Sequence, residues 1–309
     1  MKRKRETVKK NLFDLSNKLA IGAQIRSRAR YIEEGEKSTQ YFLGLEKHRQ
    51  SNNKITKLES NGKSITNSKD ILFECCAFYQ NLYKSSKPNE DDIDKYIRTC
   101  KLDNYLLTDD KNLCDEKISL QECTHVVETC LKKNKSPGLD GLTAEFYKTF
   151  WSIIGPFLVQ VFSEVFKTGH LSNSQKRAVI SLIFKSGDRE RLKNYRPISL
   201  TNTDYKILAF VLALRVQKVM KNTISDDQSG YIKNRFIGYN IRTIQDLIEY
   251  CDKFNKKGVL MFLDFKKAFD SLEWTFLKKV ISKFGFGKNF QRWVNILYTG
   301  PEAVIKNNG

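Results

Sequence analysis

The chain has 309 residues, of which 40% are hydrophobic, and its 54 Lys and Arg outnumber 35 Asp and Glu to give a formal net charge of +19. This apolar content fills one large core or two smaller ones, which excludes disorder along the whole chain. The charge favours a polyanionic partner or an acidic membrane surface, with nucleic acid the first candidate, although many basic proteins carry such charge without using it. The longest apolar run, residues 151–162, is too short to cross about 30 Å of hydrocarbon, so no membrane helix is predicted.

The amino terminus and the cysteines both indicate an intracellular protein. Residues 1–5 are basic, but no apolar run follows them, so they are not a secretory signal; a nuclear-localisation signal is an alternative interpretation. The 7 cysteines form no Cys-x-x-Cys pair, and Cys123 with His125 lacks a second ligand pair at zinc-site spacing, which favours reduced thiols. We expect the protein in the nucleus, the cytoplasm or both.

Helices dominate the elements that the sequence predicts. The charged, periodic residues 8–50 indicate one long helix or two, and residues 53–67 are typical of a hairpin around an Asn61-Gly62 turn. Residues 85–94 form a candidate linker. A capping box from Ser119 to Glu122 marks the start of a further helix. Apolar periodicity and the start and stop signals predict helices over residues 71–82, 119–133, 143–151, 156–167, 205–220 and 240–254.

Two short apolar runs are predicted as strands, residues 178–184 and 259–263, because they are rich in β-branched residues or bounded by glycine. Proline and two glycines within residues 135–141 interrupt the chain, and Gly169 is predicted to cap the helix before it in a left-handed conformation. Beyond Asp94 nothing indicates a second independent domain.

The second predicted strand ends in a carboxylate, Asp264, within the segment 258–270. A buried strand would deliver this side chain to the edge of a sheet, a position that suits a metal ligand. Phosphoryl transfer by two divalent ions requires carboxylates that bridge ions about 3.5 to 4 Å apart. An isolated aspartate at a strand end more often caps the next helix, so the pattern alone leaves both interpretations open.

The same segment resembles the first catalytic motif of reverse transcriptases from non-LTR retrotransposons of the long interspersed element type. That motif combines Phe-Leu-Asp-Phe, two charged residues, Ala-Phe-Asp-Ser and a nearby Trp, found here at residues 262–271 and Trp274. Five ordered motifs of this kind are specific where one would be weak. The other four resemble, in order, the linker between endonuclease and polymerase (31–37 with 41–43), the amino-terminal extension (135–148), the paired finger strands (183–188 and 194–200) and the segment between fingers and palm (227–231 with Arg235 and 240–241). Tyr239 departs from the pattern, since relatives often have an acidic residue there.

The resemblance implies roles for individual residues. Asp264 and the backbone carbonyl of Phe265 would bind Mg²⁺ or Mn²⁺. Phe269 would lie beneath the sugar of the nucleotide and exclude a 2′-hydroxyl. Lys185 and Arg196 would hold the triphosphate, a contact that suits a planar guanidinium. The residues implied in nucleic-acid binding are Lys135, Gln228, Tyr231 and Arg235.

The expected fold is α+β, an incomplete right-hand polymerase with a helical amino-terminal extension, fingers and the first part of the palm. We place the domains at residues 1–94 (basic linker with a small hairpin), 95–175 (helical amino-terminal extension) and 176–309 (fingers and partial palm). The thumb, the endonuclease and the Asp-Asp hairpin with the remaining metal-binding carboxylates are expected to be absent, and Asp270 is not a metal ligand in relatives. One carboxylate does not make a two-metal site, so we do not expect this chain to hold the ion stably.

The resemblance implies an RNA-directed DNA polymerase that uses an RNA template, a DNA primer and deoxynucleoside triphosphates, with no membrane partner. Whether this chain is itself an enzyme stays open. One alternative is an RNA-binding fragment without catalysis, and another is a degraded element copy without function. The nucleotide sequence after codon 309 is the observation that best separates these hypotheses.

Overall fold

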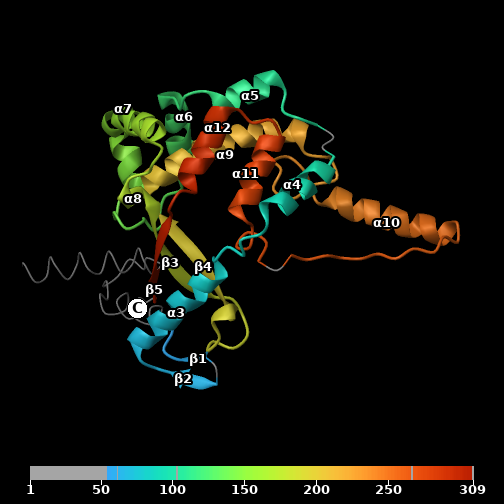
Figure 1. Cartoon of the computed structure of the whole chain (residues 1–309), viewed down its shortest axis with the longest axis horizontal. Helices are drawn as coiled ribbons and strands as arrows, with labels where there is room; N and C mark the ends of the chain where they lie inside the picture. Colours follow the sequence, from blue (N-terminus) through green and yellow to red (C-terminus); the bar gives the residue numbers. More distant parts are fainter. Residues whose placement is uncertain (1–53, 61, 102–103, 266, 308–309) are drawn as a thin grey trace, which may run out of the picture. The chain divides into compact units, whose positions relative to one another are not determined.

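The computed structural model has a mixed α+β structure in which helices predominate and the strands form two small sheets (Figure 1). The expected α+β class is therefore confirmed, whereas the right-hand polymerase arrangement stays a prediction. The helix predicted over residues 8–50 lies outside the described residues. The residues that the structure describes are 54–60, 62–101, 104–265 and 267–307.

The chain divides into two compact units. Unit 1 contains the chain up to Phe78, Ile180–Ile198 and the chain from Ile305, and unit 2 contains Tyr79–Val179 and Ser199–Val304. Each unit is assembled from segments that are far apart in sequence. The domain boundaries predicted after residues 94 and 175 stay a prediction.

The hairpin predicted in unit 1 is confirmed. Strands β1 (Leu58–Ser60) and β2 (Lys63–Ile65) pair antiparallel, with Leu58 opposite Ile65. Gly62 has a φ of 75°, the left-handed conformation that a tight hairpin turn requires. Helix α3 (Ser68–Leu82) follows and confirms the helix predicted over 71–82.

A second sheet contains three strands in the order β4-β3-β5. Strand β3 (Arg177–Phe184) confirms the strand predicted over 178–184, and β4 (Tyr195–Thr201) and β5 (Glu302–Lys306) lie on either side of it. The connection from β3 to β4 ends in a short 3-10 helix, η2 (Leu192–Asn194). It is fixed by the amide of Asn194, which donates to the carbonyl of Asp188 at 2.7 Å.

Unit 2 is mainly helical, and α9 (Thr203–Thr223) and α10 (Gly238–Lys253) confirm the helices predicted over 205–220 and 240–254. The predicted capping box is also present: Ser119 Oγ accepts from the backbone N–H of Glu122 at 3.2 Å, and the Glu122 carboxylate accepts from the Ser119 N–H at 3.0 Å. The helices are α4 (Glu90–Thr99), α5 (Thr108–Asp115), α6 (Leu120–His125), the π-helix η1 (Val126–Cys130), α7 (Ala144–Thr168), α8 (Asn173–Lys176), α9 (Thr203–Thr223), α10 (Gly238–Lys253), α11 (Trp274–Lys283) and α12 (Lys288–Leu297).

The core of unit 2 lies between α5, α6, α7, α9 and α12 (Figure 1). Phe162 of α7, Leu208 of α9 and Trp293 of α12 are among its buried side chains. Each such residue contributes roughly 1.5–3 kcal/mol by leaving water. Helix α12 also closes the end of α7, because the Arg292 guanidinium donates to the carbonyls of Phe166 at 2.8 Å and Lys167 at 2.9 Å.

One charged side chain, Arg215 of α9, lies inside this core and is only 2% exposed. Its guanidinium donates to the two carboxylate oxygens of Glu122 at 2.7 and 2.8 Å. It also donates to three carbonyls at the end of α5 and just after it: those of Cys114 at 3.1 Å, Glu116 at 2.6 Å and Lys117 at 3.0 Å. The buried charge is thus paired and fully hydrogen-bonded, which is the condition under which a protein interior tolerates one.

Helix α7 corrects one prediction. The sequence predicts two helices, over 143–151 and 156–167, but α7 is a single helix that continues through Pro156. Pro156 lacks the N–H that would bond the carbonyl of Ser152, and the two residues lie on the solvent-exposed side of the helix, where losing one bond costs less than it does in a core. The predicted left-handed cap at Gly169 is confirmed by its φ of 81°. By length and composition alone α7 is apolar enough to cross a membrane, but core helices share these properties and Phe162 of α7 is fully buried in unit 2.

Two further predictions are wrong. The linker predicted over 85–94 contains the start of α4, because Asn89 accepts from the N–H of Asp91 and caps the helix. The strand predicted over 259–263 is absent, and all five of its side chains are exposed. A strand satisfies its backbone through a neighbour, and no strand of the described residues pairs with this segment.

Candidate functional site

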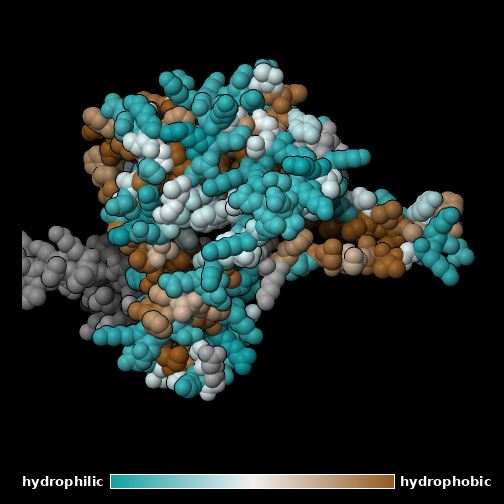
Figure 2. Space-filling view, viewed as in Figure 1, coloured by the Kyte–Doolittle hydropathy of each residue, from teal (hydrophilic) through white to brown (hydrophobic). Residues whose placement is uncertain are grey.

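Asp264 and Phe265 lie in an irregular, exposed segment between α10 and α11. The apolar residues around Asp264 are exposed too, among them Phe262 at 78% and Leu263 at 75%. Figure 2 shows a hydrophobic surface over α10 and the segment that follows it, and α10 has no buried residue. The sequence predicted a buried strand that ends at Asp264, whereas the structure places Asp264 in an irregular, exposed segment.

The donor set around Asp264 does not complete a metal centre. Among the described residues, no group of three or more His, Cys, Asp and Glu side chains is arranged to hold a metal ion. Hard divalent cations prefer several oxygen ligands. Asp264 thus offers one carboxylate, and the predicted carbonyl ligand of Phe265 stays a prediction.

Phe269 lies in a tight turn directly after Asp264. The carbonyl of Lys267 accepts from the N–H groups of Asp270 at 2.9 Å and Ser271 at 3.0 Å, which closes the turn. Whether the Asp270 carboxylate binds a metal stays a prediction of the resemblance. Phe269 is 80% exposed.

The residue that follows this turn, Glu273, holds it against the start of unit 2. Its carboxylate accepts from the hydroxyls of Ser85 and Ser86, both at 2.8 Å, and from the Ser86 N–H at 2.8 Å. The hydroxyl bonds from Ser85 and Ser86 are the main reason that the pKa of Glu273 lies below its ordinary value. Sequence analysis missed this anchor, and the adjacent serines at 85 and 86 were its only signal.

Arg235 lies at the centre of a loop that follows α9 and is held together by hydrogen bonds. Its guanidinium donates to the carbonyls of Ser225, of Gln228 at 2.8 Å and of Ile224 at 2.7 Å. Most of its donors are therefore used inside the protein, while the side chain of Gln228 is exposed. The predicted contact of Arg235 with nucleic acid stays a prediction, and its observed bonds give it the role of a loop organiser.

Tyr231 lies on the same loop and is brought together with Phe269. The two rings meet edge to face with centroids 5.6 Å apart and planes at 88°. Tyr231 is 89% exposed and has a φ of 62°, which is unusual for a bulky residue. Two residues that the resemblance assigned to different roles, nucleic-acid binding and sugar selection, thus form one contact.

Lys135 lies on a separate loop that precedes α7. The side chain is exposed, and the loop is held by the N–H of Asn134, which donates to the Glu145 carboxylate at 2.5 Å. This bond keeps the pKa of Glu145 below its ordinary value. At Gly138 an added Cβ would lie 2.1 Å from the side-chain oxygen of Asn202, so only glycine fits against that residue.

Asn202 is an anchor that sequence reasoning missed. Its position before α9 is typical of a helix cap, yet its side chain makes no capping bond. Instead its amide donates to the carbonyl and hydroxyl of Ser174 at 3.1 and 2.9 Å. Asn202 is 1% exposed, and its side-chain oxygen accepts from the N–H of Asp140 at 3.5 Å, which ties it to the loop that contains Gly138.

Lys185 and Arg196 belong to unit 1, whereas Asp264 and Phe269 belong to unit 2. Lys185 directly follows β3, and its N–H donates to the carbonyl of Asn194 at 2.9 Å. Arg196 lies on the neighbouring strand β4, and both side chains are exposed. Strands β3 and β4 are neighbours in the sheet, so Lys185 at the end of β3 and Arg196 on β4 belong to the same pair of strands. The triphosphate contact that the resemblance implies for them stays a prediction.

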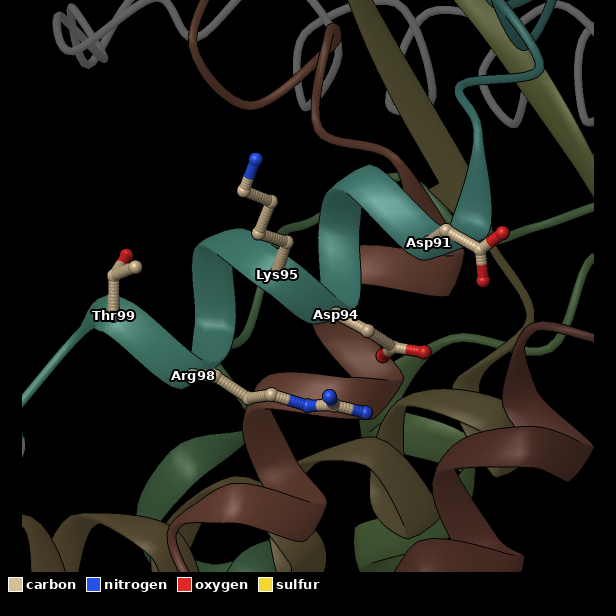
Figure 3. A pocket seen from close by; sticks show the side chains of 5 residues that line it. All are labelled: Asp91, Asp94, Lys95, Arg98 and Thr99. Carbon is tan, nitrogen blue, oxygen red and sulfur yellow. The ribbon is translucent and has the colours of Figure 1, made fainter.

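A shallow pocket of about 350 Å³ lies elsewhere, on α4. It is lined by Asp91, Asp94, Lys95, Arg98 and Thr99, and Figure 3 shows that Lys95 points away from the Asp94 and Arg98 side. Asp94 is already paired with Lys279 at 2.8 Å. None of the predicted site residues lines this pocket, so it does not compete with the segment around Asp264.

Comparison with known proteins agrees with these motifs. Residues 183–309 match the family described as reverse transcriptase (RNA-dependent DNA polymerase). The "Transposon TX1 uncharacterized 149 kDa protein" of Xenopus laevis is 32% identical over 303 residues, which cover 97% of this chain and 23% of that protein. The "Probable RNA-directed DNA polymerase from transposon X-element" of Drosophila melanogaster is 27% identical over 168 residues, covering 50% of this chain and 18% of that protein.

A third relative, the "Putative 115 kDa protein in type-1 retrotransposable element R1DM" of Drosophila melanogaster, is 27% identical over 187 residues, which cover 59% of this chain and 18% of that protein. Residues 183–309 are thus a reverse transcriptase domain. More particularly, the chain is homologous to proteins of the TX1, R1, R2 and X transposable elements. It spans about a quarter or less of the length of these three relatives.

Proposed function

We propose that this chain supplies the fingers and the first part of the palm of an RNA-directed DNA polymerase from a non-LTR retrotransposon. The observation that carries the proposal is the reverse transcriptase match over 183–309, which contains the motif around Asp264. Its substrates would be an RNA template, a DNA primer and deoxynucleoside triphosphates. The chain acts in this proposal as part of a longer protein, as its relatives are longer.

The exposed cations on neighbouring strands support a triphosphate site in unit 1. Lys185 and Arg196 would bind phosphate oxygens, with the Arg guanidinium giving two parallel hydrogen bonds. Phe269 would lie beneath the sugar and exclude a 2′-hydroxyl by its bulk. Its exposure is consistent with this role, because a core phenylalanine has no free face for a ligand.

Asp264 would contribute one carboxylate to a Mg²⁺ or Mn²⁺ centre, together with the carbonyl of Phe265. Such an ion stabilises charge on a transferring phosphoryl group when bound. The described residues do not complete the donor set, so the remaining ligands would come from other parts of the polymerase. We therefore expect no stable metal binding by this chain alone.

The decisive experiment is primer extension with RNA template, DNA primer, deoxynucleotides and Mg²⁺. Residues 1–309 alone should give no extension, because one carboxylate cannot form a two-metal site. A chimera that adds the palm and thumb of a close relative should extend the primer, and Asp264→Asn should abolish this. Asp252→Asn, the same change in an exposed residue of α10, is the matched control and should leave extension intact. Extension by the chain alone, or by the chimera carrying Asp264→Asn, would contradict the proposal.

A second candidate function is RNA binding without catalysis, and the basic stretch 171–221 favours it. This stretch contains 11 Lys and Arg against 3 Asp and Glu. Arg215 is withdrawn from any such surface because it is buried against Glu122. The remaining cations should contact backbone phosphate, so affinity should depend little on base sequence.

A salt titration with single-stranded RNA tests this second function. Release of counterions from phosphate should make the affinity of residues 1–309 fall steeply between about 50 and 200 mM salt. Lys185→Gln combined with Arg196→Gln should reduce the salt slope, whereas Lys167→Gln, an exposed lysine paired with Glu164, serves as the control. A flat titration would show that the charges only solvate the surface.

A further inference from the structure

The contact between Tyr231 and Phe269 joins two exposed aromatic rings from different segments of unit 2. Tyr231 is 89% exposed and Phe269 is 80% exposed, yet their rings meet edge to face at 5.6 Å. Edge-to-face packing is a favoured geometry for aromatic pairs. Because both side chains are open to solvent, this is not a core contact, and burial does not explain it.

The backbone of Tyr231 is held in a conformation that bulky residues rarely adopt. Its φ of 62° lies in the left-handed region, and the next such residue on the loop, Asn234, has a φ of 67°. Arg235 clamps the loop by donating to the carbonyls of Ser225 and Gln228. Backbone conformations of this kind persist where the surroundings over-determine them, and they gather at functional sites.

A second set of bonds likewise joins residues before Tyr231 to a residue after it. The hydroxyl of Ser229 donates to the side-chain oxygen of Asn240 at 2.6 Å, and the Asn240 amide donates to the carbonyl of Asp227 at 2.7 Å. Ile232, next to Tyr231, is buried. The loop is therefore fixed on both sides of the one exposed ring that faces Phe269.

The backbone around Phe269 is held in a comparable way. Lys267, at the start of its turn, has a φ of 52° and accepts two backbone bonds, and Glu273 anchors the far side through Ser85 and Ser86. Two constrained turns thus present their rings to each other. Loss of either ring would leave the other without a neighbour on that edge.

We propose that Tyr231 is a positioning residue for Phe269, so that selection of deoxyribose over ribose depends on the Tyr231 ring. This inference rests on the proposed polymerase function, in which Phe269 lies beneath the sugar. A phenylalanine that is 80% exposed has freedom to rotate. The Tyr231 ring restricts that freedom and keeps one face of Phe269 directed at the sugar. The tyrosine hydroxyl is not required.

The first test measures the ring contact in residues 1–309 and does not need polymerase activity. Phe269 is replaced by 4-fluorophenylalanine, and its fluorine resonance is recorded in four proteins: the parent, Tyr231→Asn, Tyr231→Phe and Tyr239→Asn. Asparagine accepts the left-handed backbone better than other non-glycine residues, so Tyr231→Asn removes the ring without adding strain. Tyr239 is the matched control, because it is 73% exposed and contacts Phe236 instead.

The expected result is a shifted and sharper resonance in Tyr231→Asn, and a parental resonance in Tyr231→Phe and Tyr239→Asn. An unchanged resonance in Tyr231→Asn overturns the positioning role. Circular dichroism of each variant reports whether the fold is kept. If Tyr231→Asn unfolds, the Tyr231→Gly variant replaces it, because glycine adopts a positive φ without strain, and the same two outcomes apply.

The second test measures sugar selection in the chimera that extends primers. Tyr231→Asn should raise ribonucleotide relative to deoxyribonucleotide incorporation by about two- to tenfold, the range that an edge-to-face aromatic pair supports. Tyr231→Phe should restore the parental ratio, and Tyr239→Asn should not change it. An unchanged ratio in Tyr231→Asn, with extension intact, overturns the inference while leaving the proposed polymerase function standing. Absence of extension by the unsubstituted chimera counts against the polymerase function, whereas the fluorine experiment still decides the contact.

Discussion

Helix α9 and the segment 259–263 are both rich in aliphatic residues, but they end in opposite environments. Leu208 and Val211 of α9 are at most 1% exposed, whereas Val259 and Leu263 are 96% and 75% exposed. A helix satisfies its own backbone hydrogen bonds, so its apolar face is free to pack. A strand needs a neighbour for the same bonds. Apolar sequence therefore leads to burial only where the backbone is also satisfied.

The strongest test of this comparison is Arg215→Met, which removes the charge at the centre of the α9 core. The change leaves the Glu122 carboxylate and three carbonyls without their donor. The free energy of unfolding should fall by about 3–5 kcal/mol, as when one partner of a buried ion pair is removed. Chemical denaturation measures it, and Arg242→Met, at an exposed pair with Asp246, should cost less than about 1 kcal/mol. Equal losses in the two variants would contradict the role of Arg215.

A matched pair of leucines sharpens the contrast directly. Leu208→Ala removes a fully buried side chain of α9 and should cost about 2–5 kcal/mol of unfolding free energy. Leu263 is 75% exposed, so Leu263→Ala should change the free energy of unfolding by no more than about 0.5 kcal/mol. The measurement is urea-induced unfolding followed by tryptophan fluorescence. A large loss in Leu263→Ala would show that the segment is packed in solution.

The smallest expected effect is the change in the free energy of unfolding at low pH that the Glu122 carboxylate causes. Desolvation opposes ionisation of Glu122, but the bonds from Arg215 and Ser119 together keep its pKa below the ordinary value of 4.5. A depressed pKa gives stability that is present above the ordinary value and is lost as the pH falls through the folded value. The free energy of unfolding should therefore decline below pH 4.5 and less steeply in Glu122→Gln. Denaturation at several pH values checks this, and identical slopes would argue against the pair.

Much of unit 2 could be predicted from the sequence because its signals are local. The capping box at Ser119, the left-handed cap at Gly169 and the periodicity of α9 each act within a few residues. The long helix α7 could not, because Pro156 signals a break, whereas α7 continues through Pro156 at an exposed position. Local sequence rules indicate that a proline destabilises a helix, but they do not show whether its position in the fold makes that loss small.

The sequence proposes the residues of the candidate site, but it does not predict their geometry. The motif around Asp264 and Phe269 is continuous in sequence, so resemblance finds it. The contact of Phe269 with Tyr231 and the anchors at Asn202 and Glu273 join distant segments. Arg235 resembles a nucleic-acid ligand in sequence, yet its guanidinium bonds the carbonyls of its own loop. Long-range partners of this kind leave no periodic signal.

The cap that Arg292 places on α7 has a consequence for synthesis of the chain. The arginine and the Phe166 carbonyl that it bonds are 126 residues apart in sequence. At about 5–20 residues per second, a ribosome needs roughly 6 to 25 seconds to add those residues. During that interval Phe166 of α7 lacks the ring contact that Trp293 of α12 later provides. The nascent chain therefore passes through a period in which chaperones compete with aggregation for this helix, and translation speed sets how long that period lasts.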